Sequence, residues 1–200
     1  MAKAPAISSA AARSAALAGR NAGASGVAIN VLAPAERISL RAPAASIPAL
    51  SKALGVPLPQ KPKTSALSKG NGIFGPRSKA GTRAALWLGP DEWLIIDEAG
   101  RDPKADCQPV RALHSAVGIS HRNVGISVSG PAAAATINAG CPQDLSLAAF
   151  PVGACSRTVF GKVEIVLWRT ADDVFRVECW RSFSDYVFTF LTEAARDAAA

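Results

Sequence analysis

The sequence predicts an α+β fold around a ferredoxin-like split β-α-β-β-α-β unit. Short apolar runs that alternate with polar residues predict strands, and apolar residues at helical spacing predict helices between them. Over residues 37–128 the order of these elements is strand, helix, strand, strand, helix, strand. A further helix, a three-stranded meander and a C-terminal helix follow, and we expect them to form a second layer.

The first elements are two strands and a helix. Residues 27–32 and 37–41 are expected to be extended, because apolar side chains alternate with polar ones in the second run. In the helix that follows, Pro48 suits the first turn and Gly55 ends the apolar pattern.

A β-hairpin is predicted around Pro90. The apolar runs 84–88 and 93–97 each carry a tryptophan, and a Gly-Pro-Asp-Glu turn separates them. Acidic residues at a turn apex are usually solvated, so Asp91 and Glu92 are expected to be exposed turn residues without a chemical role.

The second helix of the unit is predicted over residues 106–117, and a strand over 123–128. Gly118 ends the helical spacing of the apolar residues. The only two histidines, His114 and His121, would share a helix face only if the helix continued through Gly118. We therefore predict no metal site and no acid–base pair there.

The remaining elements form the expected second layer. A helix begins at Gly130-Pro131 and ends near Gly140, and the last helix follows a capping pair, Ser182 and Asp185. The apolar stripe predicted to pack on the sheet comprises Phe183, Tyr186, Val187, Phe190, Leu191 and Ala194. Phe188 lies off this stripe and is expected to face a partner. The meander strands are 154–160, 163–169 and 174–180.

The domain organisation predicted is a flexible, Ala-rich basic tail over residues 1–26 and a single domain over 27–200. Two packed subdomains, about 27–128 and 129–200, make up this domain, and a basic loop spans 55–83. Of the net charge of +7, residues 1–83 hold twelve Lys/Arg and one acid, whereas residues 84–200 hold ten Lys/Arg and fourteen acids.

The basic loop is expected to meet an acidic protein surface, because complementary charge speeds docking. A nucleic-acid backbone and a merely solvated loop are the alternatives. The loop contains one aromatic residue, Phe74, so it lacks the stacking platforms of a single-strand binder.

Several function classes are disfavoured by composition. No apolar run approaches the ~20 residues that span a bilayer, and the four widely spaced cysteines form no CxxC pair. We expect reduced, buried cysteines and a cytoplasmic protein. The acid-poor N-terminus resembles a transit peptide, but it is also typical of a disordered tail.

Catalytic motifs are missing from the sequence. The glycines of residues 70–75 precede Pro76-Arg77, where a phosphate loop needs Lys and Ser or Thr. There is no GxGxxG after a strand, no GxSxG and no HExxH. The chain therefore resembles a binding or scaffolding subunit and is not expected to be catalytic alone.

A resemblance to a known family rests on a succession of motifs. The chain resembles the gamma subunits of heterotetrameric sarcosine oxidase over about residues 84–197. The motifs are LWLGPDEWL at 86–94, SHR at 120–122, SVSGPA at 127–132, GCPQDL at 140–145, FPVGACSRT at 150–158 and RSFSDY at 181–186.

This resemblance implies the fold of the aminomethyltransferase folate-binding domain, whose SGPxA helix start is similar to residues 129–132. It also implies a complex that oxidatively demethylates sarcosine to glycine, releases hydrogen peroxide and passes the one-carbon unit to tetrahydrofolate. The expected partners are the alpha, beta and delta subunits. FAD, FMN, NAD, zinc and tetrahydrofolate are expected in those subunits, with no cofactor in this chain.

The sequence therefore predicts a non-catalytic gamma subunit that buries aromatic and basic residues against a larger flavoprotein. The alternatives are a free-standing folate-binding, aminomethyltransferase-like protein and a nucleic-acid-binding module that uses the basic loop. The candidate interface residues are Lys61, Lys63, Arg77, Lys79, Trp87, Trp93 and Phe188.

Overall fold

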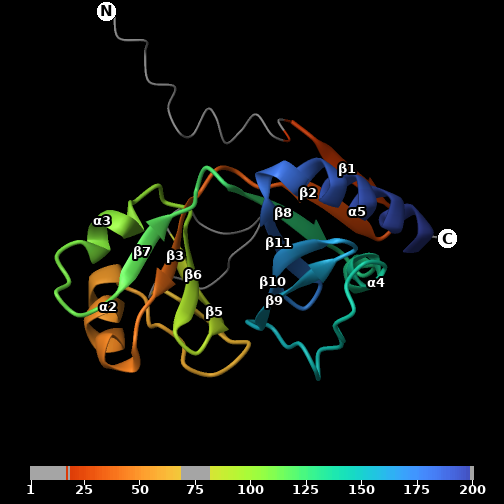
Figure 1. The fold of residues 1–200 in the computed structure, drawn as a ribbon. Coiled ribbons are helices and arrows are strands. Elements are labelled where there is room, and N and C mark those ends of the chain that lie inside the picture. The colour runs from red at the N-terminus through yellow and green to blue at the C-terminus, as the bar shows by residue number, and fades with distance from the viewer. Residues whose placement is uncertain (1–16, 18, 69–81, 199–200) are drawn as a thin grey trace, which may run out of the picture.

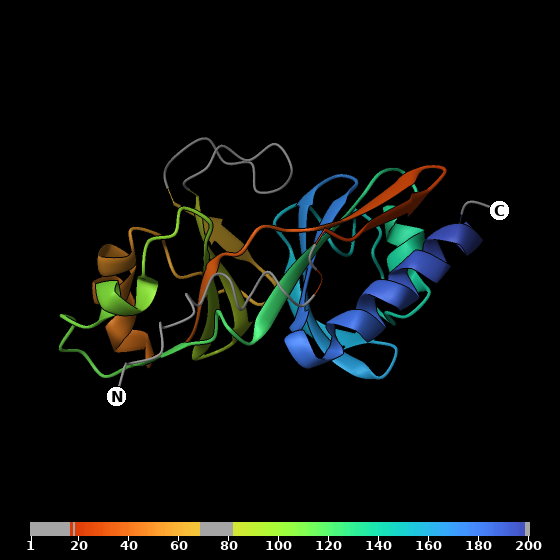
Figure 2. The same ribbon diagram turned by 90° about the horizontal axis from the view of Figure 1, so that it is seen from above.

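A computed structural model describes residue 17 and residues 19–68 and 82–198 of the chain. Two antiparallel sheets lie side by side, one of five strands and one of six (Figure 1). Figure 2 shows the helices at opposite ends of the molecule, with α2 and α3 beside the smaller sheet and α4 and α5 beside the larger one.

The five-stranded sheet contains the split unit that the sequence predicts. In space, the strands of this sheet lie in the order β4-β5-β6-β3-β7. Along the chain, the elements of the split unit follow in the order β3, α2, β5, β6, α3 and β7. This is the ferredoxin-like arrangement, so the predicted fold class is confirmed. The elements are β3 (Glu36–Arg41), the short helix η1 (Ala44–Ser46), α2 (Ile47–Leu54), β4 (Ser65–Leu67), β5 (Arg83–Gly89), β6 (Glu92–Asp97), α3 (Pro103–Cys107) and β7 (Ser115–Gly118).

The fourth strand of the unit differs from the prediction. The expected helix over 106–117 is wrong, because α3 ends at Cys107 and β7 takes the edge position next to β3. Pro109 explains the early end, since proline cannot donate to a helical hydrogen bond and disfavours helical geometry in the residue before it. The apolar residues that suggested a helical face, Leu113 and Val117, are 78% and 53% exposed.

The six-stranded sheet gathers segments that are far apart in sequence. Its order is β1-β2-β8-β11-β10-β9, so β2 and β8, which the sequence places in the first subdomain, pair here. β1 also corrects the expectation of a flexible tail through residue 26. The elements are β1 (Asn21–Ala24), β2 (Val27–Val31), β8 (Asn123–Ser129), α4 (Ala133–Asn138), β9 (Cys155–Phe160), β10 (Val163–Ala171), β11 (Val174–Trp180), the short helix η2 (Arg181–Phe183) and α5 (Ser184–Ala198).

Helix α5 covers one face of the six-stranded sheet, but its buried stripe is rotated from the predicted one. Val187, Phe188 and Leu191 are buried, whereas Phe183 and Tyr186 are 41% and 39% exposed. Phe188 therefore packs in the core of this chain and does not face a partner. Three- and four-residue spacing permits either stripe, so only the position of the sheet decides between them.

The two sheets are joined by apolar packing and by part of the basic loop. Leu86, Leu94 and Ile96 of the smaller sheet pack with Val166 and Trp168 of the larger one. Residues 65–67 of the expected loop form β4, and the Trp168 indole Nε1 donates a hydrogen bond to Ser65 Oγ at 2.9 Å. The loop over 55–83 is thus partly structural.

Gly130 lies at the sharp entry to α4, and its backbone should tolerate no side chain. Its φ is +115°, and a Cβ there would overlap the carbonyl oxygen of Gly26. We expect Gly130→Ala to lower the free energy of unfolding by about 2 kcal/mol or more. Urea denaturation would measure this loss.

Gly100 provides the matched control, because its φ is +75° and open space surrounds its Cβ position. Gly100→Ala carries only the positive-φ cost of about 1 kcal/mol. Equal losses in the two variants would contradict the steric argument.

Candidate functional site

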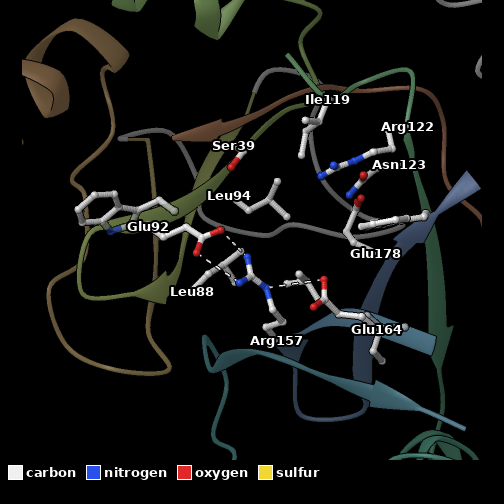
Figure 3. A pocket seen from close by; sticks show the side chains of 14 residues that line it. Ser39, Leu88, Glu92, Leu94, Ile119, Arg122, Asn123, Arg157, Glu164 and Glu178 are labelled. Atoms are coloured by element: carbon white, nitrogen blue, oxygen red, sulfur yellow. Dashed lines mark hydrogen bonds and ion pairs between the residues drawn. The ribbon is translucent and has the colours of Figure 1, made fainter. Parts of the chain in front are cut away.

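The candidate site is a cleft between the two sheets, which we call the inter-sheet cleft (Figure 3). Ser39, Glu92 and Leu94 line it from the smaller sheet, and Arg157 and Glu178 line it from the larger one. Its volume is about 60 Å³, enough for roughly four to six waters. Pockets for drug-sized ligands measure about 300–1,000 Å³, so this cleft suits a side chain better than a folate or a flavin.

An ion-pair chain crosses the open side of the cleft. The carboxylate of Glu92 lies 2.5 Å from Arg157 Nη2, and Arg157 also approaches Glu164 at 3.8 Å (Figure 3). Glu92 also lies 2.9 Å from Arg41 Nη2. The hydrogen bond from Arg157 lowers the pKa of Glu92, against the opposing effect of burial. Glu92 is therefore a buried structural anion, which corrects the expectation that it is a solvated turn residue.

A second ion-pair network is buried at the inner end of the cleft. Arg37 Nε of β3 donates to Glu178 Oε2 of β11 at 2.7 Å, and Arg176 Nε donates to Glu178 Oε1 at 2.8 Å. Arg176 also pairs with Glu98. Burial alone would raise the pKa of Glu178, but the two guanidinium groups outweigh it and lower the pKa. This network links the two sheets.

A glycine makes room for the second network. A Cβ on Gly125 of β8 would lie 2.9 Å from Glu178 Oε1 and 3.1 Å from the guanidinium groups of both arginines. Glycine in the middle of a strand commonly marks such a close approach. The sequence signal was present, because residues 176 and 178 are charged and lie on the same face of a strand whose other face is apolar.

A third network stabilises the smaller sheet. Arg83 Nε of β5 lies 2.8 Å from Asp97 Oδ2 of β6, and Arg83 Nη1 lies 2.7 Å from Asp106 Oδ2 in α3. Asp97 is fully buried and also pairs with Arg101. These contacts hold the short helix α3 against the hairpin.

The cysteines behave as the sequence predicts. All four are unbridged and buried. Burial raises the pKa of the Cys155 and Cys179 thiols to about 12, so both are neutral at physiological pH. Among the described residues, no group of three His, Cys, Asp or Glu side chains is placed to hold a metal ion.

The candidate interface residues differ in their exposure to solvent. Lys61 and Lys63 are exposed, whereas Arg77 and Lys79 lie outside the described residues. Trp87 is half-buried. Trp93 corrects the prediction, because it is fully buried against α2 and its Nε1 donates to the Pro59 carbonyl at 2.7 Å.

Sequence reasoning missed an exposed group at the end of the larger sheet. Trp180 is 41% exposed, and the guanidinium carbon of Arg122 lies 4.9 Å from its ring centroid. Phe183 stacks on Trp180 with 6.1 Å between centroids. The sequence gives no signal for this group, because a strand end and a helix start do not show which rings reach solvent.

Comparison with known proteins identifies the family. The model of the "Sarcosine oxidase, gamma subunit family" matches residues 42–197. The chain belongs to the sarcosine oxidase gamma subunit family. The gamma subunit of Corynebacterium sp. (strain P-1) is 32% identical over 76% of this chain and 70% of the relative. The gamma subunit of an Arthrobacter species is 30% identical over the same shares.

Solved structures agree with this membership of the sarcosine oxidase gamma family. A chain of heterotetrameric sarcosine oxidase from Corynebacterium sp. U-96, in complex with pyrrole 2-carboxylate, superposes with a TM-score of 0.78. That match covers 97% of this chain and 96% of the other, at 27% identity. Glycine cleavage system aminomethyltransferase T from Bartonella henselae shares the fold, with a TM-score of 0.61 at 14% identity over 86% of this chain and 49% of that one.

In the part of this gamma-family chain that the structure covers, no helix combines the length and the apolar character needed to cross a bilayer.

Glu178 should dominate the acid sensitivity of the gamma-family fold. Glu178→Gln leaves the buried guanidinium group of Arg37 without an anion and leaves Arg176 with Glu98 alone, so we expect a loss of about 3–5 kcal/mol in the free energy of unfolding at pH 7. Because the folded-state pKa of Glu178 is lowered, its contribution is present above the unfolded value of about 4.3 and is lost as the pH falls below it. The gap between wild type and variant should therefore narrow below about pH 4.

Denaturant unfolding between pH 3 and 8 would test this expectation. Glu164→Gln is the control, since the Glu164 side chain is 54% exposed and its loss should cost less than about 0.5 kcal/mol. A Glu178→Gln variant as stable as wild type at pH 7 would contradict the role assigned to the network.

Proposed function

We propose that this chain is the gamma subunit of a heterotetrameric sarcosine oxidase and serves assembly instead of catalysis. The observation that carries the proposal is the likeness to a chain of that complex over nearly the whole length of both chains. A free-standing enzyme of the aminomethyltransferase class would need a ligand pocket, which the inter-sheet cleft is too small to supply. A separate hollow of about 500 Å³, lined by Asn30, Arg37 and Asn123 among others, is large enough, so the folate measurement below decides this alternative.

The proposed complex oxidatively demethylates sarcosine to glycine in the cytoplasm, with hydrogen peroxide as a product and transfer of the one-carbon unit to tetrahydrofolate. The alpha, beta and delta subunits would be the partners of this chain. FAD, FMN, NAD, zinc and tetrahydrofolate would be bound by those subunits, and no cofactor by this chain.

The state of the ionisable groups supports a structural role. Arginines hold Glu92 and Glu178 as anions with lowered pKa values, whereas a general base works best with a pKa near the operating pH. Burial keeps the Cys155 and Cys179 thiols protonated, so neither is an activated nucleophile. These groups are suited to holding two sheets together.

Co-expression with the alpha, beta and delta subunits tests the proposal. We expect an affinity tag on this chain to recover all four subunits in equal amounts with sarcosine oxidase activity. The purified chain alone should turn over no sarcosine. Leaving this chain out should reduce the yield of the assembled complex, since the other subunits would expose the surface that it covers.

An untagged version of the chain with tagged alpha subunit provides the control for tag-dependent capture. Recovery of the chain alone, with an active complex of the other three subunits, would refute the proposal. A saturable signal from a reduced folate with the isolated chain would favour the free-standing folate-binding alternative.

A further inference from the structure

Four exposed side chains lie at one end of the six-stranded sheet, at the end of β11 and the start of α5. We call Arg122, Trp180, Phe183 and Tyr186 the aromatic patch. Trp180, Phe183 and Tyr186 are 41%, 41% and 39% exposed, and they follow one another at three-residue spacing. Single exposed apolar residues are normal on a protein surface, whereas several together commonly mark an interaction site.

The aromatic patch is held by rigid backbone. The Arg181 amide donates to the Arg122 carbonyl at 2.6 Å, which ties the turn before β8 to the end of β11. The Ser184 hydroxyl donates to the Arg181 carbonyl at 2.8 Å and secures η2 at the start of α5. A backbone held in this way loses little conformational entropy when a partner covers the aromatic patch.

The charge around the aromatic patch is positive. Arg122 and Arg181 form no side-chain ion pair with any residue in the described ranges, and both are exposed. Two acids at the same end of the sheet are already engaged, since Glu164 pairs with Arg157 and Asp185 with Arg20. A partner segment with carboxylates would therefore complement this surface.

The composition of the aromatic patch is that of a binding hot spot. Tryptophan, tyrosine and arginine are the residues most enriched among those that carry binding energy in protein interfaces. The guanidinium group of Arg122 over the Trp180 ring presents a cation and an apolar surface side by side. Trp180 also lines the inter-sheet cleft, so a side chain inserted into the cleft would contact the same ring.

We propose that the aromatic patch docks this chain onto another subunit of the complex. The segment that it receives carries an apolar side chain flanked by carboxylates. This inference rests on the proposed function and names the surface that performs it. A second copy of this chain is a poorer occupant, because a protein with a net charge of +7 repels itself.

Alanine variants in the four-subunit complex test the aromatic contribution. We expect Trp180→Ala to weaken binding of this chain to the other three subunits by about 30-fold or more, with a smaller loss for Phe183→Ala. Leu113→Ala is the control, since Leu113 is 78% exposed in the loop before β7 and its removal should change the Kd less than about twofold. Dilution of the purified complex, followed by mass photometry, would give the dissociation constants.

Charge variants test the chemistry of the partner segment. Arg122→Glu should slow association, and its deficit should shrink as the salt concentration rises, because the attraction is electrostatic. Arg122→Lys keeps the charge and should retain most of the association rate. If Arg122→Glu slowed association by misfolding the surface, added salt would not restore the association rate. The salt dependence of the association rate therefore separates a docking defect from a loss of stability.

The outcomes are distinguishable. Failure of the wild-type chain to join the complex would refute the proposed function itself. A wild-type complex in which Trp180→Ala and Arg122→Glu bind as tightly as wild type would refute the docking surface alone. A third outcome would also overturn the proposed docking surface: the isolated chain dimerises, and Trp180→Ala abolishes the dimer. The aromatic patch would then bind a second copy of this chain.

Discussion

The buried pairing of Arg37 with Glu178 is the contact on which the arrangement of the two sheets depends. Arg37 lies on β3 of the smaller sheet and Glu178 on β11 of the larger one, and both side chains are almost fully removed from solvent. A buried charge without its partner is costly, so the sheets are stable only in the relative position that brings these groups together. Apolar packing of Leu86 and Leu94 adds buried apolar area between the sheets. Apolar area is non-directional, so it does not by itself fix the relative position of the two sheets.

The relative position of the two sheets also determines the shape of the inter-sheet cleft and the surface beside it. The Glu92–Arg157 pair bridges the open side of the cleft, and the cleft is left too narrow for a large ligand. The end of the larger sheet then presents Trp180 beside the mouth of this cleft, next to the start of α5. The chain thus combines a rigid interior, whose charges are used internally, with an exposed aromatic surface. That combination is typical of a subunit whose contribution is made through contacts.

Local sequence patterns predicted the hairpin, the meander and the ferredoxin-like order, because alternation, turn residues and glycine stops act over a few residues. They failed where the deciding contact is distant in sequence. β7 was read as helix because Leu113 and Val117 have helical spacing, and only pairing with β3 shows that the segment is extended. Trp93 and Phe188 were placed at an interface for the same reason, since nothing local says which face of an element the core covers. The aromatic patch was missed because its members come from the turn before β8, the end of β11, η2 and α5.

The order in which the two sheets take their strands from the chain affects how the protein can fold during synthesis. The larger sheet takes β1 and β2 from residues 21–31 and its other strands from beyond residue 122, whereas the smaller one is built between those two regions. During synthesis from the N-terminus, the smaller sheet can therefore close while the first hairpin still waits, unpaired, for β8 to emerge from the ribosome. Pairings between such remote segments form slowly. The waiting strands expose apolar surface and unpaired edges in the meantime, and both features favour aggregation of a nascent chain.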